Sequence, residues 1–162
     1  MTHPPKNRCT FTEVSIVLPD GCREQTVNIL LPGNGTSLNI SRDIMRPDEN
    51  FASWLYRQRG LLQKGLRKYS LFDEQPALLG EGAIAGISMH SRYRSQKEGF
   101  LFQRHAAFPL STSGVLIFTL AASDPLTERD EHFLTVCLVL PDSMIAGADD
   151  DYCDMKFSDA DG

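Results

Sequence analysis

Polar and apolar residues alternate most regularly in two runs on either side of a Pro-Gly-Asn-Gly turn, within residues 25–43. In the first run, Val27, Ile29 and Leu31 alternate with Thr26, Asn28 and Leu30. In the second run, the alternating apolar residues are Leu38 and Ile40. A period of two places each set on one face of a β-sheet. The stretch therefore predicts a β-hairpin, with apolar residues on both of its faces.

A different spacing follows between residues 47 and 69, where apolar residues recur every three or four positions. One face of an α-helix requires this spacing. Acidic residues open the segment and basic residues close it, which complements the helix dipole. The pattern predicts one long helix whose apolar face consists of Phe51, Trp54, Leu55, Leu61, Leu62, Leu66 and Tyr69.

The remaining pattern predicts mostly strands. Extended segments are expected at residues 9–18, 71–79, 82–93, 100–108 and 115–121, and a second helix at 127–138 capped by Thr127 or Asp124. The run 115–121 is apolar almost throughout, as in a central strand buried on both faces. This order predicts an α+β fold, in which the long helix and a second, C-terminal helix pack on an antiparallel β-sheet.

The charge is unevenly distributed along the 162 residues. Residues 142–162 contain seven Asp and one Lys, a charge of -6, so the preceding residues carry about +1 of the total of -5. Residues 1–141 are therefore expected to form a single domain, and residues 142–162 an acidic, flexible tail. A nearly neutral body gives no support to nucleic-acid binding, which requires a basic face.

Membrane and export signals are missing from the pattern. No apolar run reaches the roughly 18 residues of a membrane span, and residues 1–10 lack the apolar segment of a signal peptide. The cysteines, at positions 9, 22, 137 and 153, are widely spaced and form no CxxC pair. We therefore expect reduced thiols, a cytoplasmic location and no direct insertion into a membrane.

Catalytic and metal-binding motifs are also missing. The four histidines are far apart, and the sequence contains no GxGxxG, Walker or GxSxG motif. The Asp-rich tail has no twelve-residue loop closed by Glu, as a calcium site of the EF-hand type requires. His90, His105 and Arg92 are the only candidates for an enzymatic site. We expect no enzyme, no cofactor and no metal.

Several short motifs resemble a known family. They are Thr26-Val27-Asn28-Ile29-Leu30, Leu38-Asn39-Ile40-Ser41-Arg42-Asp43, Tyr56-Arg57-Gln58-Arg59, Gln103-Arg104-His105-Ala106 and the apolar strand 115–120. Together they resemble the DcrB-like family over roughly residues 14–140. More narrowly, they are similar to the Eag chaperones of bacterial type VI secretion systems.

This resemblance implies a PsbP/Mog1/DcrB-like sandwich and a homodimer without catalytic residues. It also implies a cytoplasmic chaperone that binds and shields the N-terminal transmembrane segments of a secreted effector. Such a chaperone aids loading of the effector on the secretion spike. The alternative is a protein-interaction module of the same fold that binds a soluble partner.

Under the chaperone hypothesis, the protein needs a long apolar groove for a guest helix. One candidate lining is the second face of the hairpin, and another is the long helix, where a small residue lets a guest helix approach closely. Two glutamines could form hydrogen bonds with the guest. The predicted partner-binding residues are Val27, Ile29, Leu38, Ile40, Gln58, Leu62, Gly65, Leu66 and Gln103. In the alternative reading, the apolar residues of this set form an ordinary core or a dimer interface.

Overall fold

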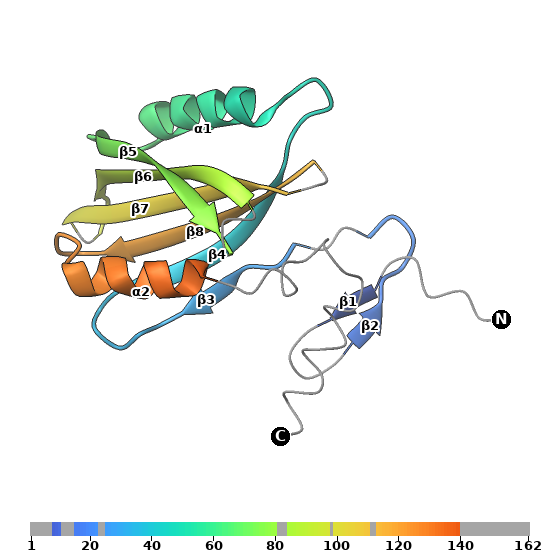
Figure 1. Ribbon diagram of the computed structural model, residues 1–162, viewed down its shortest axis with the longest axis horizontal. Helices are drawn as coiled ribbons and strands as arrows, with labels where there is room; N and C mark the ends of the chain where they lie inside the picture. Colours follow the sequence, from blue (N-terminus) through green and yellow to red (C-terminus); the bar gives the residue numbers. More distant parts are fainter. Residues whose placement is uncertain are drawn as a thin grey trace.

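The computed structural model describes residues 8–10, 15–22, 25–80, 84–97, 99–110 and 113–139. Within these residues the chain forms a six-stranded antiparallel sheet, a separate two-stranded sheet and two helices (Figure 1). The elements in chain order are β1 (Arg8–Thr10), β2 (Ser15–Val17), β3 (Asn28–Leu30), β4 (Ser37–Ile44), α1 (Phe51–Gly65), β5 (Ser70–Leu79), β6 (Ile84–Ser95), β7 (Gly99–Pro109), β8 (Gly114–Ala122) and α2 (Glu128–Leu138).

The large sheet has the strand order β3-β4-β8-β7-β6-β5, and all of its pairs are antiparallel. The predicted α+β fold is therefore confirmed. β8 lies in the interior of the sheet and buries Val115, Phe118 and Leu120, as predicted for a central strand. β3 and β5 form the two edges, and Pro76 within β5 removes a backbone donor from that edge.

The predicted hairpin is also confirmed. β3 pairs with β4 in the register Leu30 opposite Leu38. Gly33 and Gly35 in the connecting turn have φ values of 90° and 82°. Only glycine adopts this region of backbone conformation without strain, which explains the Pro-Gly-Asn-Gly sequence at the turn.

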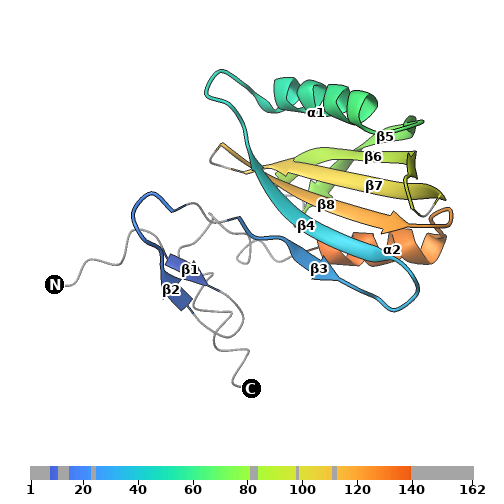
Figure 2. The same cartoon turned by 180° about the vertical axis from the view of Figure 1, so that it is seen from behind.

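The N-terminal strand prediction for residues 9–18 is wrong. Residues 8–10 and 15–17 are two short strands that pair with each other, with Cys9 opposite Ile16. Residues 11–14, between the two strands, lie outside the described residues. This small hairpin lies apart from the six-stranded sheet (Figures 1 and 2).

α1 is shorter than predicted at both ends. It begins after Asn50, whose side-chain oxygen accepts a hydrogen bond from the backbone N–H of Ser53 at 2.8 Å. It ends at Gly65, because Leu66 has extended backbone angles and Lys68 lies in the left-handed region with φ of 51°. The basic residues beyond Gly65, at positions 67 and 68, therefore belong to the loop that follows the helix.

α2 begins as predicted, with Thr127 as its N-cap. The Thr127 side chain accepts from the backbone N–H of Asp130, and the Asp130 carboxylate accepts from the backbone N–H of Thr127, which completes a capping box. Asp130 is 5% exposed and also accepts hydrogen bonds from Thr36 at 2.9 Å and Asn34 at 3.1 Å. The start of α2 is thereby fixed to the β3–β4 turn.

The two helices pack on opposite faces of the sheet. α2 buries Leu134 against a cluster that includes Leu38, Phe118 and Leu120. α1 buries Trp54 and Leu55 against the other face; the strand residues it contacts there are Ile87, Met89, Ala107, Val115 and Ile117. α2 lies in front of the sheet in Figure 1, whereas Figure 2 shows the face opposite α2.

The predicted acidic tail, residues 142–162, lies outside the described residues. Among the residues that are described, neither helix has the length and apolar character of a membrane span.

Candidate interaction surface

Cross-strand pairing determines which side chains share a face of the sheet. Ile29 lies opposite Asn39, Asn39 opposite Thr119, and Thr119 opposite His105, so these four form one row across β3, β4, β8 and β7. The neighbouring row on the same face consists of Ser37, Ala121 and Gln103. We call the surface formed by these two rows the open face.

Neither helix core reaches the open face. α2 packs on the opposite side of the sheet. The contacts of α1 lie further along β7 and β8, around Ala107 and Val115, and on β6 at Met89, which is opposite His105. Ile29 is 61% exposed, and the other residues of the open face are half-buried. In Figure 2, β3, β4 and β8 face the viewer and α1 lies toward the β5–β6 side. The sheet therefore presents a broad, partly accessible floor beside α1.

One flank of α1 borders this floor. Arg59 forms an ion pair with Glu74 of β5, which places the Arg59 side of the helix toward that edge. A helix turns by about 100° per residue, so Leu61 projects from the opposite flank, toward β7 and β8. Gly65 lies four residues later on the same flank, and a Cβ built there would meet no atom within 4 Å. Leu61 is 56% exposed, so this flank carries an apolar side chain and free space.

The dimensions suit one helix. β7 and β3 are separated by three strand spacings, which amount to about 14 Å. An α-helix with its side chains is about 10 Å wide. Thus, at the two rows of the open face, the floor from β7 to the β3 edge is wide enough for one helix, whereas further along β8 the sheet is covered by α1 at Val115 and Ile117.

His105 organises the polar part of the floor. Its Nε2 lies 2.9 Å from Oε1 of Gln103, and its Nδ1 lies 3.1 Å from Oγ1 of Thr119. An amide oxygen only accepts hydrogen bonds, so Nε2 carries the hydrogen and Nδ1 accepts from the Thr119 hydroxyl. Burial lowers the pKa of His105 to about 4, which keeps the ring neutral at pH 7.

Gln103 is therefore held by its oxygen and presents its amide nitrogen. Within the described part of the chain, that nitrogen makes no hydrogen bond, so both of its N–H groups are available to a ligand. On α1, Gln58 is oriented in the opposite sense. Its amide nitrogen donates to Oδ2 of Asp43 at 3.3 Å, beside the Trp54 ring nitrogen, which donates to the same oxygen at 2.8 Å. Gln58 thus presents its oxygen, an acceptor.

The register separates the predicted hairpin residues. Ile29 belongs to the open face, and Val27, which precedes β3, is 48% exposed. Leu38 is fully buried and Ile40 packs beside it, both on the α2 side of the sheet. The prediction that these residues line one surface is wrong, because Leu38 and Ile40 are cross-strand partners of Leu30 and Asn28 rather than of Ile29.

The predicted helix residues fall at the C-terminal part of α1. Leu62 and Leu66 are half-buried and Gly65 is exposed. Leu66 follows the helix and lines, with Gly65 and Tyr93, a cavity at the end of β6. Open-face residues outside the predicted partner-binding set include Asn39 and Thr119. Two features of the sequence could have indicated them: Asn39 is one of the polar residues that alternate with apolar ones in β4, and Thr119 is the single Thr within the apolar strand β8.

The residues considered for an enzymatic site do not meet. His90 lies opposite Arg104, which contacts Glu131 of α2, so His90 projects to the α2 side, as does Arg92 two positions later. His105 projects to the open face. No group of three His, Cys, Asp or Glu residues suited to a metal ion occurs among the described residues.

Comparison with known proteins gives a family and a fold. The family model described as DcrB matches residues 13–139. Among solved structures, the Pseudomonas aeruginosa protein of unknown function PA94 is similar at 24% identity, covering 83% of this chain and 94% of that one with a TM-score of 0.65. No curated protein matches.

Two further structures are more distant. The Saccharomyces cerevisiae Ran-binding protein Mog1p is 15% identical, covers 65% of this chain and 57% of its own, and has a TM-score of 0.36. The PsbP protein (CyanoP) of Synechocystis is 9% identical, covers 88% of this chain and 89% of its own, and has a TM-score of 0.41. The likeness to PA94 establishes a shared fold.

Proposed function

The chain belongs to the DcrB family, and we propose that it is a chaperone that holds an apolar helix of a client protein against its open face. More narrowly, the client is an effector of a type VI secretion system, and the bound segment is one of its N-terminal transmembrane helices. The chaperone acts in the cytoplasm, before secretion, and aids loading of the effector on the secretion spike.

One observation carries this proposal. The sheet face opposite α2 is left without a helix between α1 and the β3 edge, and exposed apolar side chains stand on both sides of it: Leu61 on α1 and Ile29 on β3. A guest helix lying on the floor would contact both side chains at once.

The energetic need is large. A transmembrane helix of about 20 residues exposes on the order of 1,000 Å² of apolar surface, and shielding this area is worth roughly 25 kcal/mol before the cost of association. Two apolar borders cannot shield a whole helix. A homodimer, in which two copies contribute apolar surface, brings the shielded area closer to this requirement, and the proposal includes it.

The polar groups of the floor can orient the guest helix. Gln103 presents N–H groups and Gln58 presents an oxygen, because the other end of each amide is already hydrogen-bonded within the protein. A helix that carries a Ser, Thr or Asn side chain can satisfy it there. This arrangement favours guest helices with a few polar residues over uniformly apolar ones.

Co-expression tests the proposal. The chain is produced with the product of the neighbouring gene as the guest, and the soluble complex is recovered. Ile29→Asp/Leu61→Asp should abolish recovery of the guest, because it places charge on both borders. The matched control is Val136→Asp/Val139→Asp at the end of α2, where the side chains are 57% and 59% exposed, and it should leave recovery unchanged.

The opposite result has a definite meaning. Equal recovery with both double variants, each folded by circular dichroism, would exclude the open face as the guest site. Recovery of a client that lacks transmembrane segments would favour the alternative, an interaction module for a soluble partner. The half-polar floor is the feature of the surface that favours that alternative.

A further inference from the structure

Cations gather at the end of the molecule where α1 ends and β6 turns into β7. Residues 64–68 and 92–97 contain no Asp or Glu, and Glu98 is the next acidic residue along the chain. Their basic residues are Lys64, Arg67, Lys68, Arg92, Arg94 and Lys97. We call this group the basic end. None of its members forms an ion pair with another described residue.

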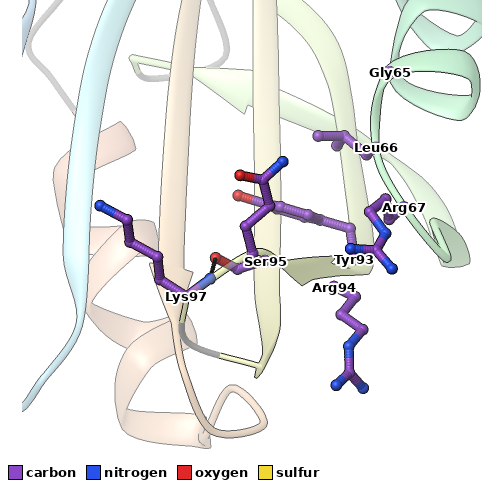
Figure 3. A pocket seen from close by; sticks show the side chains of 8 residues that line it. Gly65, Leu66, Arg67, Tyr93, Arg94, Ser95 and Lys97 are labelled. Carbon is purple, nitrogen blue, oxygen red and sulfur yellow. Dashed lines mark hydrogen bonds between the residues drawn. The ribbon is translucent and has the colours of Figure 1, made fainter.

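The backbone holds two of these cations next to each other. The N–H of Arg94 donates to the carbonyl of Arg67 at 2.8 Å, which fixes the loop after α1 to β6. Both side chains are exposed. Figure 3 shows their guanidinium groups on the same side of the β6–β7 hairpin, with Lys97 directed to the other side. The two arginines repel each other unless an anion lies between or beside them.

The same residues line a hollow. Arg67, Arg94 and Lys97 are among the residues that line a cavity of about 340 Å³, and Gly65, Leu66 and Tyr93 supply its less polar wall. Guanidinium groups bind carboxylates with paired hydrogen bonds. The chemistry of the hollow therefore suits a peptide that carries several carboxylates and an apolar or aromatic residue.

We propose that the occupant is the Asp-rich segment of this same chain, residues 142–162. Its seven Asp and one Lys give a charge of -6, opposite in sign to the basic end. Tyr152 and Phe157 within it match the apolar wall of the hollow. This inference concerns a surface other than the open face, and it does not depend on the proposed chaperone function.

The chain length permits this contact. The carbonyl of Leu138 accepts from the N–H of Gly80, so α2 ends near the start of β6. The basic end lies at the other end of β6, eleven residue steps away, or about 36 Å. Fifteen residues separate Val139 from Asp154, and an extended chain of this length spans up to about 50 Å. The carboxylates from Asp151 onward therefore reach the basic end without strain.

Cys153 provides a reporter inside the segment. In the full chain, Cys9→Ser, Cys22→Ser and Cys137→Ala leave this thiol for a nitroxide label. The label should remove most of the amide NMR intensity of Arg67 and residues 94–97. The signals should return at about 1 M salt, where the screening length falls to about 3 Å. A label at Cys22, with Cys153→Ser, should spare these signals.

Charge variants separate docking from chance proximity. Arg67→Gln/Arg94→Gln should restore the signals at low salt. The matched control Arg46→Gln/Arg129→Gln removes two exposed cations elsewhere and should not restore them. The proposal is overturned if the label leaves the basic end unaffected, or if both charge variants behave alike.

Two further experiments test whether the basic end binds something other than the Asp-rich segment of its own chain. An isotope-labelled chain with Cys153→Ser is mixed with an unlabelled, nitroxide-carrying chain; loss of signal in the mixture would assign the segment to a second copy and overturn docking within one chain. Anionic phospholipid vesicles form the other arm. Shifts of the basic-end signals with vesicles, combined with no effect of the Cys153 label, would assign the basic end to a membrane surface instead.

Discussion

Ile29 and Asn39 lie directly opposite each other in the β3–β4 pair. This single register places Ile29 on the open face, where it is 61% exposed, and places the neighbouring residue of β4, Leu38, in the core beneath α2. The hairpin thus divides its apolar residues between two tasks. Leu38 stabilises the fold, and Ile29 is free to contact a partner.

A pair of alanine substitutions tests this division. Leu38→Ala should lower the free energy of unfolding by about 2–5 kcal/mol, because it removes a fully buried side chain. Ile29→Ala should change it by less than about 0.5 kcal/mol, as expected for an exposed position. Urea unfolding of both variants measures the difference. Similar losses would show that Ile29 is covered in the folded protein.

The contact between Asp130 and Thr36 should make α2 sensitive to one carboxylate. Asp130→Ala removes the acceptor for Thr36, Asn34 and Thr127 and should cost about 2–4 kcal/mol in urea unfolding. Glu128→Ala changes an exposed acidic residue of the same turn and serves as the control. It should lower the free energy of unfolding by only a few tenths of a kcal/mol. Equal effects would mean that the hydrogen bonds of Asp130 contribute no more than a surface charge.

The contribution of the Asp130 carboxylate to the free energy of unfolding should depend on pH. Burial raises the pKa of Asp130, but the hydrogen bonds from Thr127, Thr36 and Asn34 outweigh it and lower the pKa below its ordinary value. The stabilisation is therefore complete at neutral pH and is lost as the pH falls through the folded-state pKa. The difference in unfolding free energy between wild type and Asp130→Ala should shrink in acid. A difference that is constant down to pH 3 would contradict this assignment.

His105 should make the stability depend on pH in a higher pH range than Asp130 does. Its folded-state pKa is about 4, below the value of about 6.5 in an unfolded chain. The unfolded state therefore binds more protons between these values, and stability falls as the pH is lowered from about 6.5 to 4. The loss is at most about 3 kcal/mol. Urea unfolding of His105→Gln over the same range should show a weaker dependence; parallel curves would contradict the prediction.

Gly60 tests whether α1 has free space outside the core. A Cβ at this position meets no atom within 4 Å, and alanine favours a helix interior over glycine. Gly60→Ala should therefore raise the free energy of unfolding by about 0.5–1 kcal/mol. A thermal or urea transition measures the change. A loss of stability would reveal a close contact at this position.

The sequence predicted the elements of the large sheet well and their ends less well. Alternation identified β3 and β4, the almost continuous apolar run identified β8, and Thr127 marked the start of α2, because these signals are local. The end of α1 depends on Lys68 adopting a positive φ, which the continuing apolar spacing through Tyr69 concealed. The division into β1 and β2 was missed because residues 9–18 were taken as one strand, although their alternating apolar positions shift from odd to even numbers between Phe11 and Val14.

The open face was only partly predictable. Gln103 and Ile29 were among the predicted partner-binding residues and lie on the open face, whereas Leu38 and Ile40 were grouped with Ile29 although they lie on the α2 side of the sheet. Alternation within one strand states which residues share a face, but it does not state how two strands are aligned. That alignment is set by the turn and by pairing with β8. The contribution of Asn39 and Thr119 follows from the register alone.

The most direct test of the central claim is site-specific photocrosslinking to the guest. A benzophenone side chain is placed at Leu61 beside the open face or at Val136 on α2, two positions that are 56% and 57% exposed. Each variant is co-expressed with the product of the neighbouring gene and irradiated. We expect a covalent complex with the guest from position 61 and none from position 136. Crosslinking from position 136 alone, or equally from both, would contradict it.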